Sequence, residues 1–262
     1  MKKMDVIYLW EGKEAPYTQE SQGQAQPSIT AYPVEGSKGA VVVCPGGGYT
    51  MKAPHEGGPI AEKINEAGVS AFVLDYRVKP CSIEAPLADA SRAIRVVRAM
   101  GYEKVAILGF SAGGHLTCSA ATLYTEGDPQ NEDPIERLSS RPDAFLPCYA
   151  VVSFASFRHQ GSLESLLGEK KTDYGLIRRY SAELHIDGNT PPCFLWHTAA
   201  DATVPVEQSL TLAQALAHAG IPFEMHVYPE GRHGLGLAEE YDDVKSWAEH
   251  MKYWLTKQGF AR

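Results

Sequence analysis

The stretch VAILGFSAGGHL, residues 105–116, decides the fold of this 262-residue chain. Its first four residues are apolar and predict a buried strand, and residues 114–124 predict a helix. Between them, Gly109 and Gly113 flank Ser111 in a G-x-S-x-G pentapeptide. A sharp turn between a strand and a helix strains the serine backbone and exposes its hydroxyl above the sheet. We expect both glycines to be required, because side chains there would collide with the strand and the helix.

Length and composition predict one α/β domain that spans residues 1–262. Hydrophobic residues make up 44% of the chain and charged residues 21%, which are ordinary values for a globular protein. The formal net charge of -8 argues against nucleic acid or an anionic membrane as a partner. No segment approaches the length of a membrane span.

Cysteine usage and the first residues bear on the cellular compartment. Five cysteines occur, without a C-x-x-C pair, and most lie in apolar runs: Cys44, Cys81, Cys118, Cys148 and Cys193. They are therefore expected to be reduced core residues rather than disulfides or zinc ligands. Asp5 interrupts the early apolar stretch and no small-residue cleavage site follows, so no signal peptide is predicted. A cytoplasmic protein is the simplest expectation.

Apolar strands and helices alternate along most of the chain. Strands are expected at residues 5–10, 28–34, 40–44, 70–76 and 105–108, within 144–154, and at 193–197 and 223–228. Helices are expected at residues 58–68, 87–100, 114–124, 206–220 and 237–255. In the helix over 87–100, Asp89, Arg92 and Arg95 are expected largely away from the apolar face. The alternation predicts an α/β fold with a mainly parallel central sheet and helices on both faces.

A second feature of the pattern is the segment of about residues 155–189, which has no strong strand signal. It is long for a structureless connection, so we expect it to carry short helices. An insertion at this point of the chain would sit over the ends of the later strands. We therefore predict a small lid there.

Three residues in turn-forming positions could carry nucleophilic chemistry. Ser111 is the candidate nucleophile, and a serine hydroxyl needs a neighbouring base to take its proton. His233, in a glycine-rich loop just after the last predicted strand, is the candidate base. Asp201, in the loop that leaves the strand at 193–197, is the candidate acid that orients the histidine. Glu207 and Asp187 are nearby alternatives, but neither directly follows a strand.

A run of three glycines, residues 46–48, follows an early buried strand. Glycine lets the backbone approach closely, so Gly47 and Gly48 could point amides at a developing oxyanion. The amide of Ala112, directly after the candidate nucleophile, is a further donor. The run is no phosphate loop, because no G-K-[ST] follows it. A plain turn is the alternative.

The remaining histidines have ordinary interpretations. We expect His115 to pack or hydrogen-bond locally and His197 to support the Asp201 loop. The other histidines show no metal-ligand spacing, namely His55, His159, His185, His218, His226 and His250. No metal site is therefore expected. Tyr49 could border an acyl pocket or be an exposed loop residue.

Four motifs stand in a fixed order along the chain: PGGGY at 45–49, GFSAGGH at 109–115, PPCFLWHTAADATVP at 191–205 and YPEGRHGLG at 228–236. Together they resemble the α/β-hydrolases related to acetyl-xylan esterases and short-chain acetyl esterases. The resemblance covers nearly the whole chain, from about residue 41 to 237. Related lipases carry a histidine before the three glycines, where this chain has Pro45.

The resemblance implies the α/β-hydrolase fold and a serine esterase that needs no cofactor. By resemblance, Ser111, Asp201 and His233 form the catalytic triad, and Gly47, Gly48 and Ala112 form the oxyanion hole. The implied substrate is a small acyl ester, with acetyl on a xylo-oligosaccharide or another sugar preferred.

Other functions remain open from the sequence. An amide hydrolase of the arylformamidase type shares the serine turn and the glycine run. A catalytically inactive binding protein on the same fold is a third reading, because fold alone does not fix function. The sequence also leaves open whether the chain forms a homo-oligomer.

Overall fold

An eight-stranded sheet runs through the centre of the molecule in the order β1-β2-β4-β3-β5-β6-β7-β8. The structure is a computed structural model that describes residues 5–20 and 23–261. The strands are β1 (Val6–Tyr8), β2 (Ser28–Tyr32), β3 (Gly39–Cys44), β4 (Ser70–Asp75), β5 (Lys104–Phe110), β6 (Ala144–Cys148), β7 (Cys193–Thr198) and β8 (Phe223–Tyr228). Strands β3 to β8 pair in parallel, and β2 is antiparallel to both β1 and β4. The expected mainly parallel sheet is confirmed.

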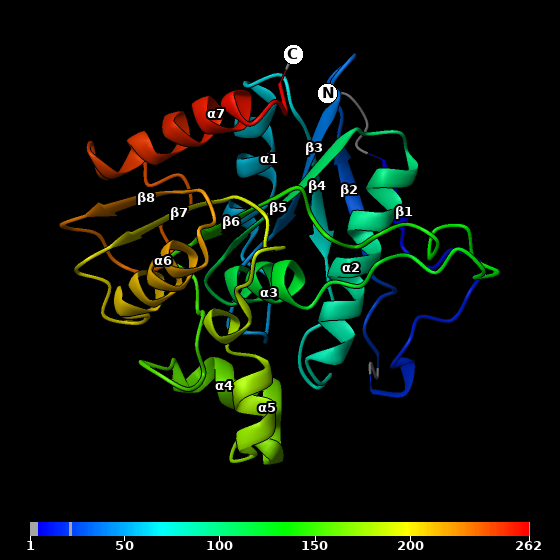
Figure 1. Cartoon of the computed structure of the whole chain (residues 1–262), viewed down its shortest axis with the longest axis horizontal. Helices are drawn as coiled ribbons and strands as arrows, with labels where there is room; N and C mark the ends of the chain where they lie inside the picture. The colour runs from blue at the N-terminus through cyan, green and yellow to red at the C-terminus, as the bar shows by residue number, and fades with distance from the viewer. Residues whose placement is uncertain (1–4, 21–22, 262) are drawn as a thin grey trace.

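Helices cover both faces of this sheet (Figure 1). The α-helices are α1 (Gly58–Asn65), α2 (Glu84–Ala99), α3 (Ser111–Thr122), α4 (Gln160–Leu167), α5 (Tyr174–Arg179), α6 (Glu207–Ala219) and α7 (Trp247–Lys257). Short 3₁₀ helices are η1 (Thr18–Glu20), η2 (Pro54–Glu56), η3 (Gly168–Lys170), η4 (Ala182–His185) and η5 (Val244–Ser246). Helices α1 and α7 lie on one face, and α2, α3 and α6 lie on the other.

Alternation along the strands explains why both faces are covered. In β3, Val42 packs with the α2, α3 and α6 layer, whereas its neighbours Val41 and Val43 pack with α1 and α7. Successive side chains of a strand point to opposite faces of the sheet, so a continuous apolar run needs a partner on each side. The core therefore has two layers, separated by the sheet.

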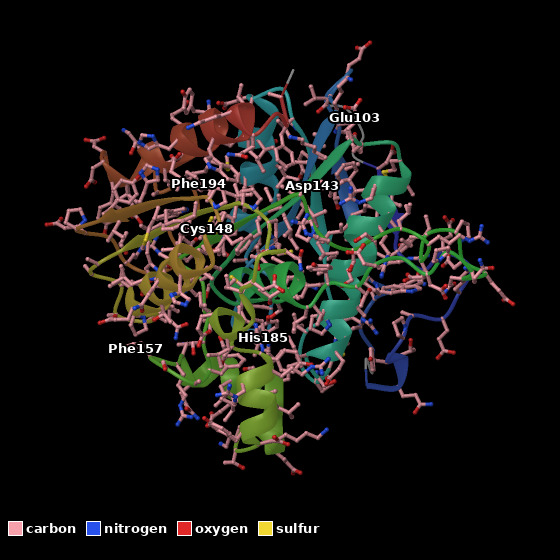
Figure 2. The ribbon with its side chains drawn as sticks, in the orientation of Figure 1. Glu103, Asp143, Cys148, Phe157, His185 and Phe194 are labelled. Atoms are coloured by element: carbon pink, nitrogen blue, oxygen red, sulfur yellow. The ribbon has the colours of Figure 1, made fainter. Side chains whose placement is uncertain are left out.

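The segment between β6 and β7 carries α4, η3, α5 and η4, which confirms the expectation of short helices there. Figure 2 labels Phe157 and His185 in this segment, away from Cys148 and Phe194 in the sheet. Buried leucines of α4 anchor the segment to the layer that holds α3 and α6.

The closing helix is shorter than expected. A helix over residues 237–255 was predicted, but only η5 and α7 are helical in this region. Gly236 and Ala238 both have positive φ values, of 57° and 58°, which no α-helix accommodates. Residues up to Asp243 therefore form turns, and the helix α7 begins at Trp247.

The charged residues of α2 are also placed differently from the expectation. Asp89, Arg92 and Arg95 are buried, at 0%, 5% and 7% exposure. Asp89 pairs with Arg77, and both arginines pair with Glu136 from the segment between α3 and β6. Partners distant in the sequence thus cover the charged face of this helix.

The five cysteines are buried free thiols, as the sequence predicts. Across residues 5–20 and 23–261, no helix has the length and apolar content that crossing a bilayer requires.

Candidate active site

The turn between β5 and α3 holds Ser111 in the left-handed region, with φ of 53°. A non-glycine residue there is strained, and such strain concentrates at functional sites. Close approach of neighbouring backbone explains both flanking glycines. A Cβ on Gly109 would meet the carbonyl of Gly113, and a Cβ on Gly113 would meet the carbonyl of Cys44. The expected need for both glycines is confirmed.

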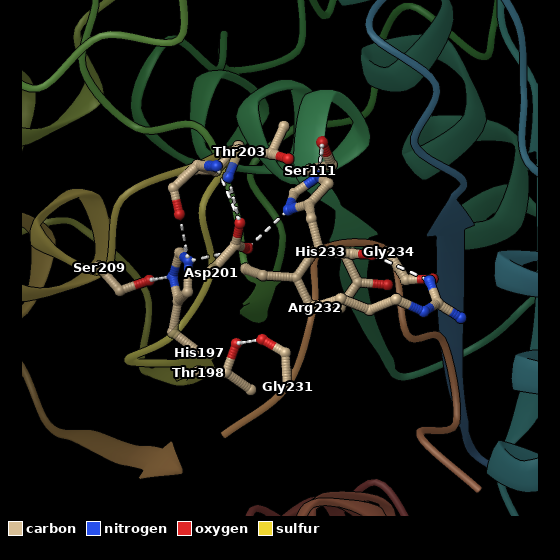
Figure 3. Close-up of polar contacts among 12 residues, drawn as sticks. Ser111, His197, Thr198, Asp201, Thr203, Ser209, Gly231, Arg232, His233 and Gly234 are labelled. Atoms are coloured by element: carbon tan, nitrogen blue, oxygen red, sulfur yellow. Dashed lines mark hydrogen bonds and ion pairs between the residues drawn. The ribbon is translucent and has the colours of Figure 1, made fainter. Parts of the chain in front are cut away.

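Loops at the carboxyl ends of β5, β7 and β8 bring three distant side chains together (Figure 3). Nε2 of His233 lies 2.8 Å from Oγ of Ser111. Nδ1 of the same imidazole lies 2.6 Å from Oδ2 of Asp201. The geometry makes a continuous hydrogen-bonded chain from carboxylate to imidazole to hydroxyl. The Ser111 residue keeps 8% of its surface exposed.

Asp201 is fixed on both of its oxygens. Oδ1 accepts the amides of Thr203 and Val204, at 2.8 and 2.9 Å. Burial alone would raise the pKa of this carboxyl, but hydrogen bonds from His197 and His233, together with charge on His233, hold it well below its usual value. Asp201 is therefore an anion that faces the imidazole.

His197 supports this loop, as the sequence predicts. Its Nε2 lies 2.9 Å from the Val204 carbonyl, so that nitrogen must carry the proton. Nδ1 then accepts from the Ser209 hydroxyl at 2.7 Å.

The alternative acids lie elsewhere. Asp187 accepts the amide of Asn189 in the turn before β7, and Glu207 begins α6.

The glycine run after β3 has backbone angles that favour glycine. Gly47 and Gly48 have φ values of 132° and 62°, and a Cβ on Gly47 would meet the Met51 carbonyl. Within the described part of the chain, the amides of Gly47 and Gly48 donate to no backbone or side-chain acceptor. Ala112 lies in the first turn of α3, where the helix dipole favours negative charge.

A buried carboxylate that the sequence analysis missed lies beside these glycines. Glu56, 2% exposed, accepts the amide of Gly46 at 2.7 Å and the hydroxyl of Tyr149 at 2.7 Å. The Tyr149 ring packs edge-on against His233, with centroids 5.2 Å apart. No periodicity or spacing marks these two residues, because they act through contacts between loops that are 93 positions apart.

Tyr49 and His115 are a second buried pair. Tyr49 is 1% exposed, so the alternative of an exposed loop tyrosine is wrong. Its hydroxyl lies 2.8 Å from Nδ1 of His115, whose Nε2 lies 2.8 Å from the Tyr180 carbonyl. Burial lowers the pKa of His115 to about 4, although the hydrogen bond to Tyr180 opposes the shift. His115 thus bonds to distant segments rather than locally.

The chain after β6 is held by Gln208 of α6. Its carbonyl accepts the amides of Val152 and Ser153, and its amide group donates to the carbonyls of Ser156 and Phe157. The next element begins at His159, whose pKa is lowered by burial and by the charge of His233. The contacts with Gln208 therefore hold the start of the insertion against α6.

Comparison with known proteins identifies related chains. Residues 31–216 match the BD-FAE family. The chain is 36% identical, over 88% of its length, to endo-1,4-beta-xylanase B of Butyrivibrio fibrisolvens. It is 30% identical, over 89% of its length, to an acetylxylan esterase of Xylanibacter ruminicola. The chain spans only 38% and 48% of these two relatives.

A solved structure matches over nearly the whole chain. The acetyl ester-xyloside bifunctional hydrolase of Caldicellulosiruptor lactoaceticus superposes with a TM-score of 0.94 at 44% identity. The match covers 98% of this chain and 97% of that one. Together with the sheet order and the serine turn, it confirms the α/β-hydrolase fold.

Proposed function

This chain belongs to the BD-FAE family of α/β-hydrolases, and on that premise we propose that it is a serine esterase acting on short acyl esters. The preferred substrate is an acetyl group on a xylo-oligosaccharide or another sugar. The observation that carries the proposal is the chain of hydrogen bonds from Asp201 through His233 to Ser111, at 2.6 and 2.8 Å.

In the first half of the proposed reaction, Ser111 is acylated. Nε2 of His233 takes the hydroxyl proton while Oγ attacks the ester carbonyl carbon. Asp201 holds the proton on Nδ1 and stabilises the imidazolium that forms. The tetrahedral intermediate then collapses, and the alcohol leaves with the proton from Nε2.

In the second half, water replaces the alcohol. His233 takes a proton from water, hydroxide attacks the acyl carbon, and the carboxylic acid departs as Ser111 regains its proton. Both tetrahedral intermediates put negative charge on the former carbonyl oxygen. The free amides of Gly47 and Gly48, with that of Ala112, are the proposed donors to this oxygen. Such a donor typically contributes about 3 kcal/mol of transition-state stabilisation.

Support for the sugar ester comes from the related proteins. One relative is named an acetylxylan esterase, and the matching solved structure is described as an acetyl ester-xyloside hydrolase. We propose that the segment after β6 acts as the lid of this site. Its first helix, α4, is capped by His159, whose pKa is lowered by burial and by the charge of His233.

The test is the release of acetate from acetylated xylo-oligosaccharides, run beside p-nitrophenyl esters of increasing chain length. Rapid release that stops with Ser111→Ala, together with failure of acyl chains beyond butyrate, supports the proposal. Cleavage of aryl esters but not sugar acetates would overturn the substrate. A formyl-anilide substrate cleaved faster than any ester would make the chain an amide hydrolase. Equal turnover by the wild type and Ser111→Ala on every substrate would show that Ser111 has no catalytic role.

A further inference from the structure

A single buried carboxylate connects three separate loops of the site. Oε2 of Glu56 accepts the amide of Gly46, which precedes the proposed oxyanion glycines. Oε1 accepts the hydroxyl of Tyr149, which directly follows β6. The Tyr149 oxygen in turn accepts the amide of Gly236 at 2.9 Å, three residues beyond His233.

Tyr149 is held in an unusual conformation at the centre of this connection. Its φ is 34°, in a region that a bulky residue rarely adopts. Aromatic neighbours surround the ring, with Trp196 at 5.0 Å and Phe110 at 5.4 Å between centroids. Burial, reinforced by the charge of Glu56, raises the pKa of Tyr149 well above its usual value, so the phenol stays a donor.

Burying a carboxylate is costly unless donors satisfy it, and here both oxygens have short hydrogen bonds. Well-packed apolar side chains can often replace buried charged groups without loss of stability, so stability alone does not explain this arrangement. What the arrangement does fix is the position of the glycine loop relative to the histidine loop. His55, the preceding residue, adds a second link because its Nε2 donates to the Gly234 carbonyl at 3.0 Å.

We propose that Glu56 and Tyr149 are positioning residues that hold the oxyanion glycines and His233 in register with Ser111. The proposal rests on the esterase function proposed above. A misplacement of about 1 Å between reacting groups can cost about 10²-fold in rate. The pair should therefore act on kcat, because neither side chain is exposed enough to contact a substrate.

The test uses Glu56→Gln, Tyr149→Phe and the double variant, with kcat and KM measured on p-nitrophenyl acetate. Tyr149→Phe removes one oxygen and keeps the ring against His233. We expect each single variant to lose about 10²-fold in kcat with little change in KM. The double variant should lose no more than the worse single variant, because both remove the same connection.

Asp89→Asn is the matched control, since Asp89 is an equally buried carboxylate whose partner is Arg77. It should lower the melting temperature and leave kcat per folded molecule unchanged. Unchanged kcat in folded Glu56→Gln and Tyr149→Phe would overturn the proposal, as would strictly additive losses.

Hydrogen exchange separates this proposal from the esterase function. Both variants should accelerate amide exchange in residues 45–53 and 229–237, whatever the substrate. If the wild type cleaves no ester, that exchange alone decides whether the connection exists. Unchanged exchange in both segments would show that Glu56 and Tyr149 position nothing.

A different observation carries a second, independent inference. Glu224 and His226 lie on the same face of the edge strand β8, and His250 of α7 faces them. Their potential ligand atoms all lie within 4.8 Å of one another. The two imidazoles stack with centroids 4.4 Å apart, and Nε2 of His226 lies 2.9 Å from a Glu224 oxygen. The sequence predicted no metal site, because these ligands come from separate elements.

We infer that these three residues bind a zinc ion at the surface of the molecule. Two imidazoles and a carboxylate are a donor set that zinc takes, at about 2.1 Å per ligand. Ligands around a tetrahedral ion lie about 3.4 Å apart, so the His226–Glu224 contact of 2.9 Å must open slightly and the wider gaps, of up to 4.8 Å, must close. Exposed His250 can close the wider gaps by rotating its ring, while His226 is held by Phe194. The ion would clamp β8, which leads into the His233 loop, to α7.

Zinc titration of chelator-treated protein tests this inference, with calorimetry and melting temperature as readouts. Wild type and His218→Ala, an exposed histidine on α6, should bind zinc and melt at a higher temperature with it. His250→Ala should bind at least about tenfold more weakly and show no shift. Equal binding by His250→Ala, or no binding by the wild type, would overturn the inference. Neither readout depends on esterase activity.

Discussion

Nε2 of the buried His197 lies 3.5 Å from Oδ2 of Asp201, the same carboxylate oxygen that accepts the hydrogen bond from Nδ1 of His233. The two histidines thus approach Oδ2 from different elements, His197 from β7 and His233 from the loop after β8. With the Thr203 and Val204 amides on Oδ1, the carboxylate has little freedom to rotate. This arrangement holds the Asp201 carboxylate in one orientation toward the imidazole of His233.

Replacing Asp201 with Asn should therefore abolish most activity without unfolding the protein. The amide can donate to Nδ1 of His233 and favour the wrong tautomer, which typically costs about 10⁴-fold in kcat. Steady-state kinetics on p-nitrophenyl acetate, with circular dichroism for folding, measures the effect. Asp187→Asn is the control and should keep wild-type kcat. Comparable losses in the two variants would contradict the assignment of the acid.

The glycine run gives a second prediction. A Cβ on Gly47 would collide with the Met51 carbonyl, and its φ of 132° is unfavourable for alanine. Gly47→Ala should move the amides proposed as oxyanion donors and lower kcat by about 10²-fold or more. Gly188→Ala is the control, because nothing lies within 4 Å of a Cβ there. A Gly47→Ala variant with full activity would show that the run is a plain turn.

The buried His115 predicts how stability depends on pH. Its folded pKa of about 4 lies below the ordinary value of 6.5, so between these values the unfolded chain binds a proton that the folded chain does not. The free energy of unfolding should therefore fall as pH drops from 6.5 to 4, by at most about 1.4 kcal/mol per pH unit from this residue.

Urea denaturation across that pH range, compared with His115→Gln, isolates the effect because other groups titrate alike in both proteins. The difference between the two stabilities should narrow as pH falls. The unfolding free energy of His218→Gln should change with pH in parallel with that of the wild type. Parallel curves for His115→Gln would mean that the histidine is not buried as a neutral base.

The buried ion pair of Arg77 and Asp89 gives a prediction on stability alone. Their side chains are 2% and 0% exposed, so Asp89→Asn removes a buried negative charge that lies 2.6 Å from the Arg77 guanidinium. A loss of about 3–5 kcal/mol in unfolding free energy is expected. Glu240→Gln, which breaks the exposed pair with Arg232, should change it by less than about 1 kcal/mol. Chemical denaturation measures both changes. Similar losses of unfolding free energy in the two variants would contradict the prediction that the buried pair contributes more than the exposed one.

Local sequence patterns predicted the strands and the serine turn well. The run from 105 to 108 and the strand at 223–228 are apolar or alternating over their own length, and the latter matches β8 residue for residue. The turn at Ser111 is partly local, because Gly109 contacts the backbone of Gly113 in the same turn, whereas Gly113 faces the Cys44 carbonyl at the end of β3. Features set by adjacent residues are therefore the ones that sequence reasoning captures.

Features that depend on partners distant in the sequence were not predicted. Arg92 and Arg95 were expected largely away from the apolar face of α2, but Glu136 covers them from a loop more than 40 residues later. The closing helix was placed too early because the positive φ of Ala238 depends on the packing of the loop after His233. Glu56 and Tyr149 gave no signal for the same reason, since their roles exist only between loops.

The most direct test of the central claim is covalent labelling of Ser111 by diethyl p-nitrophenyl phosphate, read by intact mass and peptide mapping. An activated serine beside His233 should take up one diethylphosphoryl group per chain, with release of one p-nitrophenol. The label should map to the peptide that contains Ser111 and be absent from Ser111→Ala. An unmodified wild type, or equal labelling of Ser111→Ala, would contradict the proposed nucleophile.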